Sequence, residues 1–335
     1  MNILITTAGR RTYIIDYFKE ALDGKGKVIA ANSIYTYTLS HADEYVLTPS
    51  FYANEYIPTI LSICKSKAIN AVISLLDADA KVLSEHHAAF GEIGTRLIIP
   101  SPEIMDICND KWLTYQFLMS IGLSQPKSYI DEAEVKNALI SGKLTYPILI
   151  KPRWGIGSFG IYIVENEQEI DVLSQKLRHD IMHTYMGHES EKDVEGCVLY
   201  QEIVKGQEYG VQVLNDLEGS YAATFALKKL AMRTGETDIA ETVDTAKFGT
   251  IARSIADNLH HIGMLDMDCM LTSDGSIVVL ELNCRFGGQY PFVHLANVNV
   301  PKQIVRWLEG NNTCAELITQ TDGIKSCKEL TPVVL

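Results

Sequence analysis

Short apolar runs alternate with amphipathic segments over residues 1–100. The pattern predicts strands at residues 2–7, 27–31, 70–75 and 96–100, and helices at residues 12–22, 54–67 and 78–90. Because strands alternate with helices, this part is expected to be an α/β domain with a parallel sheet covered by helices.

The pattern changes after Pro100, where Pro102 begins a helix and a second helix covers residues 111–121. From Tyr146 onward strands follow strands, which predicts an α+β domain with antiparallel sheets over residues 101–335. The predicted strands are 147–152, 160–164, 198–204, 208–214 and 220–228, followed by a helix at 245–262. The polar residues 183–195 are predicted to be a mobile loop.

Charge and composition disfavour several classes of partner. The 335 residues carry a formal charge of −13, which disfavours nucleic acid and anionic membranes but permits a small anion in a locally basic cleft. No run approaches the roughly 18 apolar residues of a spanning helix, and the N-terminus does not resemble a signal peptide. We therefore expect a cytoplasmic protein.

A glycine-rich loop follows a predicted strand that ends near Lys151. Gly155-Ile156-Gly157-Ser158-Phe159-Gly160 matches G-x-G-x-x-G, but a strand follows it, whereas a dinucleotide fold needs a helix. Protein kinases need H-R-D and D-F-G motifs, which are missing. The remaining interpretations are a flap whose backbone N–H groups close over phosphates, with Lys151 beside them, and a plain hairpin.

An acidic hairpin is the most informative segment. Asp274-Gly275 predicts a two-residue turn, which places Asp268 opposite Glu281 and Asp266 opposite Asn283 on one face. Opposed carboxylates with nothing basic among them suit a hard cation, Mg²⁺ or Mn²⁺, bound by Asp268, Glu281 and Asn283. Arg285 follows closely enough to contact an anion on that metal. The alternative is a solvated acidic face.

Two further segments each allow two interpretations. Glu202 and Glu208 can accept hydrogen bonds from an adenine amine and ribose hydroxyls, and Val204 can offer backbone groups to adenine; the same residues also suit an ordinary strand turn. The charged stretch around Arg233 either binds an acid substrate or is a solvated loop.

Taken in order, these residues resemble the ATP-grasp superfamily. The resemblance covers essentially the whole chain and is strongest to the carboxylate–amine ligases that are like the carbamoyl phosphate synthase large subunit and biotin carboxylase. Its most specific element is LELNCRFGG, residues 280–288. It implies a pre-ATP-grasp domain at residues 1–100 and an ATP-grasp domain at 101–335, with a central or lid part at about 101–200 and a catalytic part at about 201–335.

The resemblance also implies roles for individual residues. Phosphates of ATP would contact Lys111, Lys151 and the flap residues Gly155, Gly157, Ser158, Phe159 and Gly160; adenine would contact Glu202, Ile203 and Val204, and ribose Glu208. Magnesium would bind Asp268, Glu281 and Asn283, and Arg285 would bind the transferred phosphate. Asp268 stands where many members carry Glu or Gln, and Cys284 replaces a frequent proline.

The implied activity is ligation of a small carboxylate to an amine, with ATP and Mg²⁺ or Mn²⁺. Gly9, Arg10, Arg11 and Arg233 would bind the acid, because arginine binds both carboxylate oxygens and ligands collect at the carboxyl ends of parallel strands; Arg285, Lys151 and Arg233 would be catalytic. A homodimer is expected through the apolar helix at 12–22. A phosphotransferase, a carboxyphosphate- or carbamoyl-phosphate-type enzyme and a non-catalytic nucleotide-binding protein remain alternatives.

Overall fold

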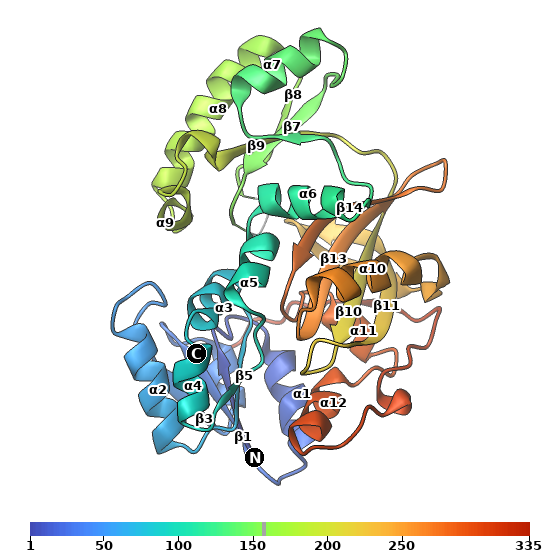
Figure 1. Ribbon diagram of the computed structural model, residues 1–335. Coiled ribbons are helices and arrows are strands. Elements are labelled where there is room, and N and C mark those ends of the chain that lie inside the picture. Colours follow the sequence, from blue (N-terminus) through green and yellow to red (C-terminus); the bar gives the residue numbers. More distant parts are fainter. Residues whose placement is uncertain (156–158) are drawn as a thin grey trace.

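The apolar runs near the N-terminus form a five-stranded parallel sheet in the order β3-β2-β1-β4-β5 (Figure 1). The computed structural model describes residues 1–155 and 159–335. The strands are β1 (Asn2–Thr6), β2 (Lys27–Asn32), β3 (Glu44–Leu47), β4 (Ala71–Ser74) and β5 (Arg96–Leu97), and the helices are α1 (Thr12–Leu22), α2 (Tyr56–Ser66), α3 (Asp77–Ser84) and α4 (His87–Glu92). The predicted α/β architecture is confirmed.

Two elements of this region differ from the sequence prediction. The edge strand β3 was not predicted, because Tyr45 and Leu47 are about half exposed and the strand carries no buried apolar run. The helix predicted over 78–90 is divided into α3 and α4 by a turn after Ser84.

A small antiparallel sheet of order β6-β9-β7-β8 forms the upper part of the molecule in Figure 1. Two helices, α5 (Pro102–Asn109) and α6 (Lys111–Ser120), connect the parallel sheet to it. Its strands are β6 (Ser128–Tyr129), β7 (Ile148–Pro152), β8 (Tyr162–Val164) and β9 (Val198–Glu202), with helices α7 (Glu132–Ile140), α8 (Glu167–Met182) and α9 (Gly187–Ser190). We call residues 128–202 the lid.

The prediction of a mobile polar loop at residues 183–195 is wrong. Part of it forms α9, and Met186, Glu189 and Ser190 are buried. Tertiary contacts cause this burial, and the local polarity of the sequence gave no sign of it: the His188 ring stacks on Tyr52 of the N-terminal region at 3.9 Å between centroids.

The C-terminal part contains an antiparallel sheet of order β14-β13-β10-β11-β12-β15. Its strands are β10 (Gln207–Asn215), β11 (Tyr221–Arg233), β12 (Glu236–Thr242), β13 (Gly263–Leu271), β14 (Ile277–Asn283) and β15 (Lys325–Cys327), and its helices are α10 (Gly249–Leu259), α11 (Tyr290–His294) and α12 (Val300–Leu308). Buried side chains of α10 pack on one face of this sheet, and those of α11 and α12 pack on the other. The predicted α+β architecture with antiparallel sheets is confirmed.

Helix α1 packs against α12 of the same chain (Figure 1). Ile14 and Phe18 of α1 join Ile304 of α12 in one buried cluster. The apolar face on which the expected homodimer rested is therefore covered within the chain.

The β13–β14 hairpin carries the predicted pairing but a different turn. Asp268 faces Glu281 and Asp266 faces Asn283, as expected. However, Leu271 pairs with Ile277, and the Thr272 backbone N–H donates to the Ser276 carbonyl. Residues 273–275 therefore form a three-residue loop, and the predicted two-residue turn is wrong. An extra residue in β14 between Val279 and Glu281 shifts the register back.

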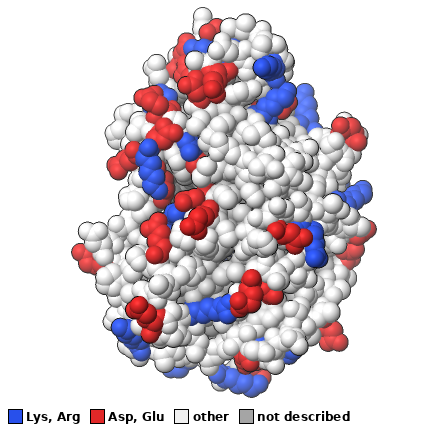
Figure 2. All heavy atoms as spheres, viewed as in Figure 1, with Lys and Arg blue, Asp and Glu red and all other residues white. Residues whose placement is uncertain are grey.

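Acidic and basic side chains are interspersed on the face shown in Figure 2, and no single basic patch dominates that view. Among the described residues, no helix is long and apolar enough to cross a membrane.

Candidate active site

Lys111 is placed by the first turn of α6. Asp110 caps this helix by accepting hydrogen bonds from the backbone N–H groups of Trp112 and Leu113, at 2.9 and 3.3 Å. The same carboxylate receives two hydrogen bonds from Arg153, which follows β7. Helix and strand are thereby fixed together, and the Lys111 Nζ atom lies 3.9 Å from a carboxylate oxygen of Glu281.

Lys151 projects from β7 into the same region. Burial lowers the pKa of Lys151 to about 8, and the neighbouring charge of Lys111 contributes, while Glu281 and Asp268 oppose the shift. Two lysines that repel each other in a partly dry site favour the binding of an anion between them. The structure therefore brings Lys111, Lys151 and the acidic hairpin together.

The hairpin offers oxygen atoms from both strands. Asp268 and Glu281 face each other across β13 and β14, with side chains that are 30% and 28% exposed, and Asn283 is buried beside them. These carboxylate and amide oxygens are the donors that Mg²⁺ uses in proteins, often together with phosphate oxygens. Among the described residues, no group of three or more His, Cys, Asp or Glu side chains is arranged to hold a metal. The predicted set of two carboxylates and one amide fits a cation that completes its shell with a ligand.

The expectation that nothing basic lies among these carboxylates is wrong. Lys229 of β11 is buried, and its Nζ atom lies 2.7 Å from both Glu208 and Asp268. Burial would lower the pKa of Lys229, but the charges of Asp268 and Glu208 outweigh it and raise that pKa. Lys229 is thus a permanent cation beside the hairpin.

Gln289 is a second residue that the sequence analysis missed. Its amide nitrogen donates to Asp266 at 2.6 Å and to Asp268 at 3.1 Å. The end of its side chain lies where a Cβ at position 210 of β10 would be, so a larger residue there would displace the Gln289 amide. Burial raises the pKa of Asp266 to about 6, and the charge of Asp268 contributes.

Arg285 emerges from β14 into a buried ion-pair network. Its Nε atom donates to Asp77 of the N-terminal region at 2.8 Å, and Nη1 lies 3.7 Å from Asp266. Burial would lower the pKa of Arg285, but Asp77 and Asp266 raise it. Arg285 therefore links the two large sheets of the molecule beside the hairpin.

The predicted base-binding residues lie where the lid meets the C-terminal sheet. Glu202 ends β9, and residues 203–206, which include Ile203 and Val204, connect it to β10. Glu202 accepts a hydrogen bond from the Lys127 backbone N–H at 3.2 Å, and Glu208 pairs with Lys229. These residues line a boundary between two sheets, and their roles remain predictions.

The flap is described only in part. Gly157 and Ser158 lie outside the described residues. Gly155 accepts a hydrogen bond from the Lys111 Nζ atom through its carbonyl at 2.6 Å, so the start of the flap touches the lysine pair. Phe159 is 41% exposed, and Gly160 adopts a positive φ of 63°.

The N-terminal residues line a cavity of about 340 Å³ at the carboxyl ends of β1, β2 and β4. Gly9, Arg10 and Arg11 line it, and Arg10 is exposed. Arg11 also donates from Nη1 to the carbonyls of Leu75 and Phe286, at 2.6 and 2.9 Å, and so joins the N-terminal region to the segment after Arg285.

Arg233 lies at the turn between β11 and β12. Its guanidinium is about half exposed and pairs with Asp238 at 2.7 Å. Burial would raise the pKa of Glu236 in the same hairpin, but Lys328, Arg11 and Arg10 lower it. The β11–β12 hairpin therefore lies near Arg10 and Arg11. Arg233 itself forms its ion pair with Asp238 of the same hairpin.

Comparisons with known proteins agree with this arrangement. Residues 3–98 match the family model described as PylC-like, N-terminal domain, and residues 108–289, more than half of the chain, match the model described as ATP-grasp domain. The carbamoyl phosphate synthase arginine-specific large chain of Bacillus subtilis (strain 168) is 24% identical over 213 residues. That match covers 61% of this chain, which spans about a fifth (19%) of the length of the curated relatives it matches.

Solved structures share the fold. A biotin carboxylase–β,γ-ATP complex from Campylobacter jejuni superposes with a TM-score of 0.74 at 17% identity, covering 95% of this chain and 73% of that one. An L-amino acid ligase from Bacillus licheniformis superposes with a TM-score of 0.73 at 16% identity, covering 96% and 78%. The matched ATP-grasp model, the fold and the residues gathered around the hairpin agree, and the chain belongs to the ATP-grasp family.

Proposed function

We propose that this protein is an ATP-dependent ligase that activates a carboxylate as an acylphosphate and joins it to an amine. The observation that carries the proposal is the convergence of Lys111 and Lys151 on the opposed carboxylates Asp268 and Glu281. Such a site can bind both parts of a metal nucleotide. The lysines would contact the phosphate oxygens, and the hairpin carboxylates would bind the metal.

Each group has a proposed place in nucleotide binding. Lys111, Lys151 and the flap contact the phosphates, and Glu202, Ile203, Val204 and Glu208 surround the nucleoside at the boundary between the two sheets. Asp268, Glu281 and Asn283 hold Mg²⁺, with Mn²⁺ as an alternative. When bound, the metal would neutralise charge on the phosphate oxygens.

The reaction divides into two displacements. An oxygen of the substrate carboxylate attacks the γ-phosphorus, and the bond to ADP breaks. The nitrogen of a free amine then attacks the acyl carbon, phosphate leaves, and the nitrogen loses one proton. Lys151 and Arg285 stabilise negative charge on the transferred group in a site that the lid shields from water.

The acid substrate is proposed to occupy the N-terminal side of the site. The cavity at Gly9 and Arg10 lies at the carboxyl ends of parallel strands, where ligands of α/β sheets collect. The Arg11 side chain stabilises this side of the cavity through its hydrogen bonds to the backbone carbonyls of Leu75 and Phe286. Arg233 approaches from the other side with its hairpin.

A panel of carboxylic acids and amines, including amino acids, tests the proposal. Each pair is incubated with ATP and Mg²⁺, ADP release is measured, and products are identified by mass spectrometry. The proposal expects ADP release that depends on both substrates, together with a new amide. Amine-independent release with no amide for any pair would contradict it.

One alternative has specific support. The curated relatives are named carbamoyl phosphate synthase large chains, and an enzyme of that type would release ADP with bicarbonate as the acid. Bicarbonate belongs in the same panel, and its product separates the two functions. A cytoplasmic location and a homodimer also stay proposals; a native mass in solution tests the dimer.

A further inference from the structure

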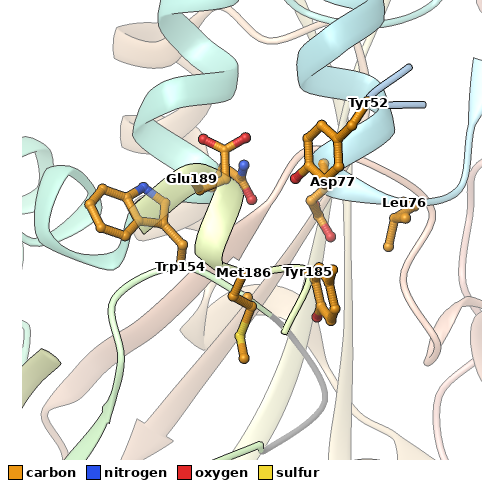
Figure 3. A pocket seen from close by; sticks show the side chains of 10 residues that line it. Tyr52, Leu76, Asp77, Trp154, Tyr185, Met186 and Glu189 are labelled. Carbon is orange, nitrogen blue, oxygen red and sulfur yellow. The ribbon is translucent and has the colours of Figure 1, made fainter. Parts of the chain in front are cut away.

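A narrow pocket lies where the lid meets the N-terminal region (Figure 3). The N-terminal region contributes Tyr52 and Asp77, and the lid contributes Trp154, Met186 and Glu189. The pocket touches Gly155, whose carbonyl binds Lys111. It is therefore next to the proposed phosphate site, yet none of the roles assigned above uses it.

The lid contacts that build this pocket are specific. The rings of Tyr52 and His188 stack with an angle of 19° between their planes. The Met186 side chain occupies the space that a Cβ at position 155 would fill, so a larger residue there would displace Met186, and the φ of 107° at Gly155 also favours glycine. The pocket therefore depends on how the lid segment around Met186 and His188 packs.

Asp77 leaves one carboxylate oxygen unsatisfied in this pocket. The side chain is buried, with 2% relative exposure, and Oδ2 accepts the hydrogen bond from Arg285. Oδ1 is buried and has no hydrogen-bond partner among the described residues. Leaving a buried acceptor without a partner is unfavourable, and more so when the group is charged, so a donor is expected to occupy this place.

The surroundings define the chemistry of that donor. The second carboxylate, Glu189, is already paired with Lys192 at 2.9 Å, and Arg153 beside Trp154 is already paired with Asp110 and Asp193. The charge of Asp77 is paired with Arg285 through Oδ2, so Oδ1 is the acceptor that none of these cations satisfies. Carboxylate oxygens and aromatic rings favour a cationic donor and disfavour an anion.

Size restricts the ligand further. The pocket has a volume of about 20 Å³, close to the space that one water-sized group needs. An ammonium group fits, with its alkyl chain directed outward, whereas a guanidinium or a quaternary ammonium is too large.

We propose that this pocket binds the ammonium group of a primary amine through Asp77, and that the amine substrate of the ligase enters here in this form. The bound ammonium then releases one proton to solvent, and the resulting free amine attacks the acyl carbon. The identification as substrate rests on the proposed function, but binding itself does not. Asp77 contacts Arg285 through Oδ2 and would contact the amine through Oδ1. The amine nitrogen is therefore held near Arg285, which would contact the transferred phosphate.

Trp154 provides a direct assay, because its side chain lines the pocket. Trp112→Phe and Trp307→Phe leave Trp154 as the only tryptophan. The full chain is titrated with methylammonium chloride, and tetramethylammonium chloride and sodium chloride at equal ionic strength serve as controls. We expect a saturable change in emission with methylammonium alone.

Two variants test the pocket from different sides. Asp77→Asn should weaken methylammonium binding at least about tenfold, since hydrogen bonds to charged groups are the strong ones. Ala78→Val should block the pocket while leaving the Asp77–Arg285 pair, which covers the case in which Asp77→Asn fails to fold. Glu85→Gln, an exposed acid just after α3, should bind as the parent does.

A response without saturation, an equal response to tetramethylammonium, or binding unchanged in both pocket variants would overturn the proposal. The titration needs no ATP and no turnover. Failure of the ligase panel would leave this result standing, and failure here would leave the ligase proposal standing.

Discussion

Replacing Glu281 by Gln should separate stability from activity at the hairpin. The side chain faces Asp268 across β13 and β14, and its ion pair in the described structure is a long one, 3.9 Å from Lys111. Glutamine keeps the shape and removes the charge. If these carboxylates exist for a metal nucleotide, the variant should lose turnover without losing its fold.

The expected change in stability follows from the geometry. Opposite residues on paired strands have Cβ atoms about 4.5–5.5 Å apart, and two like charges about 5 Å apart repel by about 3 kcal/mol at an effective dielectric constant of 20. Both side chains are nearly one third exposed, and Lys229 offsets part of the charge of Asp268, so about 1 kcal/mol remains. Loss of the Lys111 pair offsets some of this gain. Tm should therefore stay unchanged or rise by up to about 4 °C.

The expected change in activity is much larger. A metal contributes several kcal/mol of transition-state stabilisation, and each 1.36 kcal/mol is a factor of ten in rate, so ATP turnover should fall by about 10³ or more. Turnover is measured by ADP release and Tm by scanning fluorimetry, with Glu218→Gln, an exposed acid between β10 and β11, as control. Turnover within tenfold of the wild type, or a Tm lower by several degrees, would refute the reasoning.

Two further predictions concern the lysines. Lys229→Met should lower Tm by several degrees, because Glu208 and Asp268 would face each other without their shared cation; Lys228→Met, whose side chain points to the other face of β11, should change Tm much less in the same assay. Because the pKa of Lys151 is lowered to about 8, the free protein loses this charge above pH 8, whereas a bound anion raises that pKa. The Kd of ATP–Mg²⁺ should therefore increase between pH 8 and 9.5, with proton uptake in calorimetry; a flat profile, or the same increase in Lys151→Arg, would contradict the assignment.

The pairing of the hairpin could be predicted from sequence, although its turn could not. Asp274-Gly275 favours a tight turn, but side chains choose the loop: the Asp274 carboxylate accepts hydrogen bonds from the Thr272 hydroxyl and the Ser276 backbone N–H. The longer loop shifts the register by one residue, and the extra residue in β14 shifts it back. The correct pairing of Asp268 with Glu281 thus results from two compensating irregularities.

Other site residues are set by contacts between distant segments. Asp77 meets Arg285 across 208 positions of the chain, and neither local periodicity nor spacing signals that pair. Lys229 did carry a signal: it alternates with Phe225 and Leu227, which are buried on the same face of β11. A lysine at a buried strand position needs a carboxylate partner, and this reasoning could have placed it beside the acidic hairpin.

The site holds groups of both signs that are incompletely satisfied without ligands. Burial, followed by the charge of Lys111, lowers the pKa of Lys151. Burial, followed by the charge of Asp268, raises the pKa of Asp266, and Asp77 keeps one oxygen without a partner among the described residues. An anionic ligand relieves the lysines, a divalent cation relieves the hairpin, and an ammonium relieves Asp77. These charged groups lie on three different segments of the chain. Each bound ligand therefore stabilises the arrangement in which the segments lie close together, so lid closure and substrate binding should strengthen each other.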